Sequence, residues 1–409
     1  MKRITQILFT MLLINILTPF IIAENFKNQN IQKGFIHVIG DKLIDEQGHE
    51  IFLRGFAIDP FSYQKFKKAS NPYSKEQIFQ FNKDKFKYFI SEDDIINIRK
   101  MGCNVIRKQI HFYDCEIAPY KYDDNILQVF DELIERSYKH GVYVIISLTQ
   151  AAQNSKQQDN MLAYRGKPLL WTDIEFQKRV IAFMGYMASH FAKNPGVAGY
   201  DVVNEPEAPS TKALYSFYSN VINEIRKFDK KHIIILEKAH FNADKCKDNP
   251  FGGKYNDTNI MLSLHYYNDA NERAKVNPKF VQYDNKEEIQ RKMKILLSYP
   301  NVKCHPIFVG EFSALWDANE FGLQWTKDTI QLMNKKKMHW TYFGYKNIFG
   351  ARRGLYSAIK WWRQGITESQ KMNLKIEKKQ EKLLSTKKNY ILNKKVKDIL
   401  LKGFSRIKG

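Results

Sequence analysis

Three kinds of motif are missing from this chain of 409 residues, and each absence narrows its function. No Gly-rich phosphate-binding loop follows any expected strand, which argues against a nucleotide site on an open, doubly wound sheet. The polar residues singled out below lack metal-ligand spacing. No basic-aromatic reading motif accompanies the formal net charge of +22, so nucleic acid is a poor explanation for it. We therefore expect no metal, no other cofactor and no nucleic-acid partner.

Cysteine is also scarce, with 4 residues in the chain. In the layout expected below, Cys103 and Cys304 precede strands, whereas Cys115 and Cys246 follow them. Disulfides within each of these pairs are geometrically easier than disulfides across them. Buried free thiols explain the four residues equally well.

The chain begins with a basic Met1-Lys2-Arg3, followed by an apolar run from Ile4 to Ile22 and the small residue Ala23. This order is typical of a signal peptide, and we predict one over residues 1–23. A transmembrane anchor is the alternative, although the run is barely long enough to span a bilayer. The corresponding prediction is a secreted, extracellular protein or one delivered to a lysosome-like compartment.

The opposite end of the chain is basic. From Lys371 onward there are 13 Lys or Arg against 3 acidic residues, so 13 − 3 = +10 of the formal charge lies there. Its apolar residues have a partly helical spacing, compatible with contact with an anionic membrane surface or a role in surface adhesion. A solvated helix is the alternative. We predict that residues 369–409 form a basic tail, either helical or disordered.

The middle of the chain alternates between strand and helix patterns. A small antiparallel hairpin over residues 35–45 comes first. The expected strands are 51–58, 104–110, 142–148, 197–205, 232–237, 259–267, 306–312 and 339–345. The expected helices are 92–100, 126–140, 173–193, 210–228, 286–298 and 319–337, with a short or missing helix between the fifth and sixth strands. This order predicts an α/β fold, a parallel (β/α)8 TIM barrel over residues 24–368.

In such a barrel the functional residues lie at the C-terminal ends of the strands. The polar or aromatic residues expected there are Arg107, Asn204, Glu205, His265, Tyr267, Glu311 and Trp340. Singly, each has a structural explanation, such as a surface ion pair for Arg107. Together they converge on one face, and two carboxylates flanked by Arg, His, Tyr and Trp are the groups that a glycosidase needs.

These residues resemble glycoside hydrolase family 5. The resemblance covers roughly residues 52–362, and five motifs carry it: Val105-Ile106-Arg107, Gly199 to Pro206, Leu264-His265-Tyr266-Tyr267, Phe308-Val309-Gly310-Glu311-Phe312 and His339-Trp340-Thr341-Tyr342. It implies that Glu205 is the acid/base and Glu311 the nucleophile. It also implies an ionised nucleophile and an acid/base that is protonated at neutral pH.

The resemblance assigns roles to the neighbouring residues as well. Asn204 would bind the 2-hydroxyl of the sugar at the cleavage point. Arg107 and Tyr267 would align Glu311, and His265 would lie beside the acid/base. Trp340 would form the platform under the sugar ring.

One position departs from the family pattern. Family members commonly carry Asp-x-His at the end of strand three, where this chain has Ser147-Leu148-Thr149-Gln150. The missing His usually contacts the sugar, so the departure concerns the substrate more than catalysis. We expect Gln150 to replace it as a hydrogen-bond donor.

The resemblance implies a retaining, cellulase-like endo-β-glucanase that acts on a β-linked polysaccharide or glycoconjugate. β-Mannan and glycolipid are the alternative substrates. The long insertion after strand one, including Tyr63 and Lys65, and the Tyr266-Tyr267 pair keep the glycolipid under consideration. An inactive carbohydrate-binding barrel is the alternative from another class. We expect a monomer.

Overall fold

The computed structural model describes residues 34–58, 87–149, 168–240, 243–267, 283–314, 320–347, 354–358 and 390–405. All of them belong to one compact unit, Lys33–Gly409. No helix in these ranges is long and apolar enough to cross a membrane. The expected signal peptide and the insertion with Tyr63 and Lys65 lie outside the described residues.

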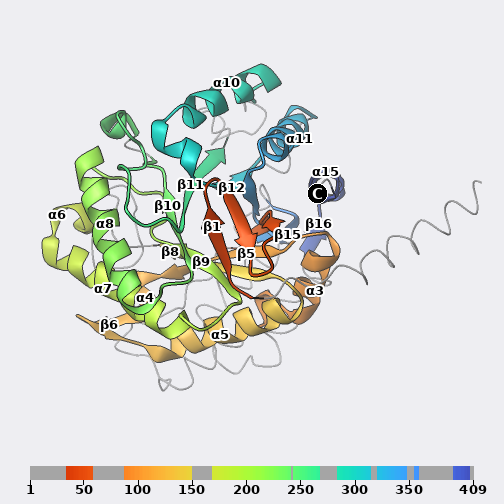
Figure 1. Ribbon diagram of the computed structural model, residues 1–409. Coiled ribbons are helices and arrows are strands. Elements are labelled where there is room, and N and C mark those ends of the chain that lie inside the picture. The colour runs from red at the N-terminus through yellow and green to blue at the C-terminus, as the bar shows by residue number, and fades with distance from the viewer. Residues whose placement is uncertain are drawn as a thin grey trace, which may run out of the picture. The chain divides into compact units, whose positions relative to one another are not determined.

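Eight parallel strands close into a barrel (Figure 1). They are β4 (Arg54–Ile58), β5 (Val105–His111), β8 (Tyr143–Thr149), β9 (Val197–Asp201), β10 (Ile233–Glu237), β11 (Ile260–Tyr267), β12 (Ile307–Ser313) and β13 (His339–Phe343). The pairing of β13 with β4 closes the ring. The predicted (β/α)8 barrel is confirmed, with all eight strands at the expected places.

Helices follow most strands and form the outer layer (Figure 1). They are α3 (Glu92–Lys100), α5 (Asp124–Lys139), α7 (Ile174–Phe191), α8 (Thr211–Phe228), α10 (Lys286–Leu297) and α11 (Glu320–Lys335). Side chains cap several N-termini, as Ser210 does by accepting a hydrogen bond from the Ala213 N–H. Between β10 and β11 the described residues contain only the 3-10 helix η1 (Ala243–Cys246), as the irregular sequence there predicts.

Smaller elements fill the connections. They are α4 (Phe112–Cys115), β6 (Glu116–Ala118), β7 (Lys121–Tyr122), α6 (Leu169–Thr172), η3 (Pro300–Cys304), β14 (Lys346–Asn347), β15 (Tyr356–Ala358) and β16 (Tyr390–Leu392). None of the four cysteines forms a disulfide, and Cys304 alone among them is exposed.

The predicted N-terminal hairpin closes the bottom of the barrel. Strands β1 (Ile36–Ile39) and β2 (Lys42–Asp45) pair antiparallel, and β3 (Glu50–Ile51) extends them. Alternate side chains of the hairpin share one face, and Ile36 and Leu43 are buried in a cluster with the lower interior residues of the barrel strands. The strand ends where a site is expected therefore lie on the opposite side of the barrel.

The basic C-terminal segment is not an appended tail. Residues 394–404 form helix α15, capped by Asn393, and its apolar side packs on the barrel. The Phe404 ring stacks on that of Trp340, with centroids 4.8 Å apart, and Asn334 Nδ2 of α11 donates to the Gly403 carbonyl. Since α15 covers β13, it serves as the last helix of the barrel.

The expected boundary at residue 369 lies outside the described residues, but helix α15 beyond it packs on the barrel rather than apart from it. This packing also removes the apolar surface that a membrane would need from this helix, because Val396 and Leu400 are buried in the barrel unit. The other apolar residues considered, Leu383 and Leu384, lie outside the described residues.

We predict that replacing Phe404 with Ala lowers the free energy of unfolding by about 3–5 kcal/mol, because it removes a buried ring from a packed contact. Urea denaturation measures this change. The matched control is Ile391→Ala, since Ile391 is 60% exposed and should change stability by no more than about 0.5 kcal/mol. Equal effects of the two substitutions would show that α15 does not dock in solution.

Candidate active site

A buried arginine occupies the centre of the barrel. Arg107 is 1% exposed, and its side chain points inward from β5. Its Nε donates to Asp201 Oδ2 at 2.8 Å and its Nη1 to Glu311 Oε1 at 2.7 Å. Its Nη2 lies 2.9 Å from Ser147 Oγ and 2.8 Å from Glu237 Oε1. One cation thus joins side chains from five strands.

The predicted nucleophile Glu311 is held at both carboxylate oxygens. Arg107 contacts Oε1, and the hydroxyl of Tyr267 donates to Oε2 at 2.7 Å. Gln109, two residues after Arg107 on the same face of β5, lies 3.3 Å from Oε1. The expected contacts of Arg107 and Tyr267 with Glu311 are therefore present. They orient the carboxylate.

Asn204 lies between Arg107 and the barrel mouth. Its Oδ1 accepts a hydrogen bond from Arg107 Nη2 at 2.8 Å. A guanidinium can only donate, which fixes the orientation of the amide and directs its Nδ2 away from Arg107. Asn204 is thus a preset donor beside the two glutamates.

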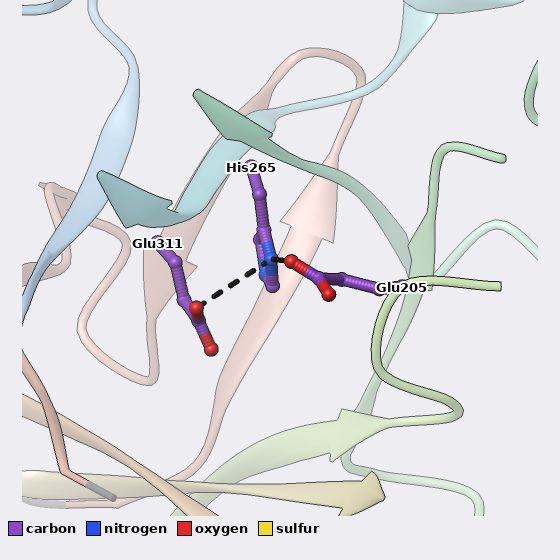
Figure 2. Close-up of side chains that lie close together, drawn as sticks. All are labelled: Glu205, His265 and Glu311. Atoms are coloured by element: carbon purple, nitrogen blue, oxygen red, sulfur yellow. Dashed lines mark hydrogen bonds and ion pairs between the residues drawn. The ribbon is translucent and has the colours of Figure 1, made fainter. Parts of the chain in front are cut away.

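Glu205 lies beyond its strand rather than in it. We expected the fourth strand to run through residue 205, but β9 ends at Asp201. The chain then turns, and Glu205 adopts a left-handed backbone with φ of 50°. Its Oε1 accepts a hydrogen bond from His265 Nδ1 at 2.8 Å. The turn places the Glu205 carboxylate across from Glu311 (Figure 2).

The two carboxylates and the imidazole form one tight group. An oxygen of Glu205, an oxygen of Glu311 and a ring nitrogen of His265 all lie within 4.8 Å of one another (Figure 2). These atoms could hold a cation only if His265 Nδ1 lost its proton, which it donates to Glu205 in this arrangement. The group therefore fits proton transfer better than metal binding.

The charges of this group are strongly coupled. Burial alone would lower the pKa of His265, but Glu237 and Glu311 and the hydrogen bond to Glu205 raise it well above its usual range. Burial would raise the pKa of Glu205, yet the hydrogen bond and charge of His265 lower it below its usual range. The expectation that Glu205 is protonated at neutral pH is therefore wrong for the free protein.

Two buried carboxylates were not foreseen as part of the site. Asp201 and Glu237 are at most 1% exposed. Burial and the charge of Glu237 raise the pKa of Asp201 to about 7. Burial would raise the pKa of Glu237, but His265 and Arg107 lower it to about 2. A signal for Glu237 was available, since it ends a strand otherwise made only of Ile and Leu.

His240 is a further group that sequence reasoning missed. Its Nε2 lies 3.7 Å from Glu205 Oε1, and the side chain is 24% exposed. Burial lowers its pKa below the usual range. The neutral ring is therefore available for hydrogen bonding beside the acid/base candidate.

Trp340 is not where the resemblance implied. Trp340 is 0% exposed, and its indole N–H donates to Asn334 Oδ1 of α11 at 3.0 Å. The cause is strand alternation, because Trp340 and Tyr342 point outward to the helices and residues of opposite parity point inward. Phe343, the last residue of β13, has its ring 6.3 Å from that of Tyr267. Phe343 therefore occupies the position expected for Trp340.

The structure describes only part of the segment at the end of strand three that departs from the family pattern. Gln150 lies outside the described residues, and Thr149 ends β8. His111 of β5 is paired in register with Thr149 and shares the inward face with Arg107 and Gln109. A histidine thus stands one strand away from the position where the family usually has one.

The sequence of this chain is similar to those of known glycoside hydrolases. A family profile described as Cellulase (glycosyl hydrolase family 5) matches residues 66–348. The beta-xylosidase of Phanerodontia chrysosporium is 24% identical over 342 residues, covering 77% of this chain and 71% of that protein.

Solved structures share the fold. An endoglucanase from the hyperthermophilic Thermotoga maritima has a TM-score of 0.54 at 19% identity, covering 74% of this chain and 92% of its own. Its other structures include complexes with mannotriose and with cellobiose. An endogalactoceramidase has a TM-score of 0.56 at 15% identity, covering 76% of this chain and 74% of its own.

A closed (β/α)8 barrel with two facing glutamates among Arg, Asn, His and Tyr defines a glycoside hydrolase. Because the family profile covers well over half of the chain, the protein belongs to glycosyl hydrolase family 5.

We predict that the protein is most active at acidic pH. If Glu205 must donate a proton, its protonated fraction falls as pH rises through its lowered pKa. Because kcat/KM reports the free enzyme, its alkaline limb should lie well below neutrality. Replacing His265 with Asn should raise the pKa of Glu205 and move that limb to higher pH, although maximal activity falls.

The measurement is the pH profile of kcat/KM on one soluble β-glucan. The control is His190→Asn, because His190 pairs with Asp131 on the helical surface and should leave the limb in place. An alkaline limb that stays put or moves to lower pH in the His265 variant would contradict the assignment.

Proposed function

We propose that this protein is a secreted, retaining endo-β-glucanase that cleaves β-linked glucan by double displacement. One observation carries the proposal: carboxylate oxygens of Glu205 and Glu311 lie within 4.8 Å of one another. Retaining glycosidases hold their carboxyl groups about 5–5.5 Å apart, and inverting enzymes about 6.5–9.5 Å. The spacing leaves no room for a water between the second carboxylate and the sugar.

In the first step, an oxygen of Glu311 bonds to the anomeric carbon as the bond to the bridging oxygen breaks. Glu205 transfers its proton to that bridging oxygen, which leaves as a hydroxyl. In the second step, Glu205 accepts a proton from water, the water oxygen bonds to the anomeric carbon, and Glu311 departs as a carboxylate. Glu205 is therefore an acid first and a base second.

The neighbouring side chains support both steps. Arg107 and Tyr267 hold the Glu311 carboxylate in place, so its orientation costs little at the moment of attack. Asn204, with its amide fixed by Arg107, donates to the 2-hydroxyl of the sugar, a contact that strengthens in the transition state. Phe343 supplies the apolar surface under the sugar ring.

The structure weakens the case for a glycolipid substrate. Tyr266 does not face the site, because its ring stacks on Trp325 with centroids 5.5 Å apart and its hydroxyl donates to Asp284. Helix α15 packs its apolar side on the barrel. Tyr266 and helix α15 therefore lend no support to a glycolipid substrate, and we propose soluble β-glucan instead.

We predict that the purified protein releases reducing sugar from barley β-glucan, more slowly from β-mannan, and none from a glycosylceramide. A 2-deoxy-2-fluoro-β-cellobioside with a good leaving group should inactivate it and add one glycosyl mass to the peptide that contains Glu311. Peptide mass spectrometry identifies the labelled residue.

The control is Glu311→Gln, which should be inactive and should not be labelled. Folded protein with neither hydrolysis nor labelling would instead support an inactive carbohydrate-binding barrel. Faster hydrolysis of the glycosylceramide than of both polysaccharides would overturn the glucan assignment.

We predict opposite effects for Phe343 and Trp340 of β13. Phe343→Ala should lower kcat/KM about 10-fold to 100-fold by removing apolar contact with the sugar, with little change in stability. Trp340→Ala should lower the free energy of unfolding by about 3–5 kcal/mol and leave kcat/KM of the folded protein near wild type. Kinetics and urea denaturation of both variants test the pair, and a Trp340 variant that is stable but inactive would restore the platform role to Trp340.

A further inference from the structure

Two hydrogen-bond donors, the backbone N–H of Glu205 and the Arg107 guanidinium, and the Nε2 atom of His265 converge on the buried carboxylate of Glu237, at the C-terminal end of β10. Its Oε2 accepts the backbone N–H of Glu205 at 2.8 Å. Its Oε1 lies 2.8 Å from Arg107 Nη2 and 3.2 Å from His265 Nε2. The side chain of Glu237 is 2% exposed, so these protein groups replace water around its charge.

The bond to the Glu205 N–H acts on an unfavourable backbone. Glu205 has a φ of 50°, in the left-handed region that is unfavourable for residues other than glycine. Such conformations persist where surrounding contacts hold them. The carboxylate of Glu237 supplies a charge-assisted hydrogen bond at that peptide, which keeps the Glu205 side chain aimed across the mouth at Glu311.

Glu237 also acts on the Glu205 carboxyl, through its contact with His265. His265 donates from Nδ1 to Glu205 Oε1, while its Nε2 faces Glu237. A carboxylate at each ring nitrogen stabilises the doubly protonated imidazole and fixes its orientation. Glu237 therefore contacts the acid/base candidate at its backbone and, through His265, at its reacting group.

Other charged groups surround Glu237 as well. Arg107 approaches from β5, Asp201 from β9 and Glu311 from β12. From α8, Tyr218 donates its hydroxyl to the Glu237 backbone carbonyl rather than to the carboxylate. Arg107 has two further carboxylate partners, Asp201 and Glu311, whereas the Glu205 N–H has no other acceptor among the contacts of the described residues. Replacing Glu237 should therefore disturb mainly the position of Glu205.

We propose that Glu237 is a positioning residue for the acid/base, holding the Glu205 turn and the His265 imidazole so that Glu205 can protonate the leaving oxygen. This role rests on the proposed function. It predicts that replacing Glu237 lowers kcat/KM more for a leaving group that needs protonation than for one that does not. Dinitrophenolate leaves without a proton, whereas phenolate benefits from one.

The test compares wild type with Glu237→Gln, a variant of the same shape. Its amide offers one acceptor oxygen where Arg107 and the Glu205 N–H donate to two, and its NH2 group faces a donor. We expect kcat/KM, which reports the glycosylation step, to fall about 100-fold for phenyl β-cellobioside. For 2,4-dinitrophenyl β-cellobioside it should fall less than about 5-fold. A general loss of structure would lower both values equally, and that result would overturn the proposal.

The control is Glu116→Gln. Glu116 is also a buried carboxylate paired with an arginine, Arg179, but it lies on β6 away from the two catalytic glutamates. This variant should keep the wild-type ratio between the two substrates. If Glu237→Gln does not fold by circular dichroism, Glu237→Asp, which keeps the charge at a shorter reach, should show the same selective loss in weaker form.

A second readout needs no activity and separates this role from the proposed function. In a pH titration followed by ¹H–¹⁵N NMR of the imidazole, His265 should lose its proton at lower pH in Glu237→Gln than in wild type. Wild type inactive on both aryl cellobiosides would refute the glucanase assignment while the titration still tests Glu237. An unchanged His265 titration would overturn the positioning role.

Discussion

The site is organised by the burial of one guanidinium. Placing Arg107 inside the barrel removes its charge from water, which costs several kcal/mol unless carboxylates replace the lost solvation. Asp201, Glu237 and Glu311 do so, and their charges raise the pKa of Arg107 above its ordinary value despite its burial. Each carboxylate comes from a different strand, so the cation also sets how the strand ends are arranged. The position of the nucleophile follows from this arrangement.

The same electrostatics explain why a cationic His265 lies against a residue that must act as an acid. A lowered pKa of Glu205 opposes proton donation in the first step and favours proton acceptance in the second. A retaining enzyme needs both steps, and the slower one limits turnover. Under the proposed retaining mechanism, His265 would shift the balance toward release of the glycosyl-enzyme. An acidic working environment, such as the lysosome-like compartment that is one of the predicted destinations, would restore the first step.

Much of this arrangement could be predicted from local sequence. The eight strands are apolar runs bounded by turn and cap residues, and Arg107, Asn204, Glu205, His265, Tyr267 and Glu311 follow from motif and strand order. The features that could not be predicted depend on the direction of a side chain or on contacts between residues distant in the sequence. Trp340 and Phe343 both belong to β13, and only the register of the strand tells which one faces inward. Glu237 stands out as the one charged residue of an Ile and Leu strand, but the sequence does not show that its side chain meets Arg107 and the Glu205 N–H. Helix α15 has an apolar face, but its docking on Trp340 involves residues 64 positions apart in the sequence, which a local pattern does not reveal.

The docking of α15 also has a consequence for how the molecule opens. Its first residue comes 51 positions after the end of β13 (394 − 343), so the helix docks through contacts between residues far apart in the sequence. No barrel hydrogen bond runs through α15, so its detachment leaves the ring of strands paired. We infer that α15 is a separate unit of local unfolding. Its amides would exchange with solvent before those of the barrel, and the Trp340 ring would become wet while both glutamates stay in place.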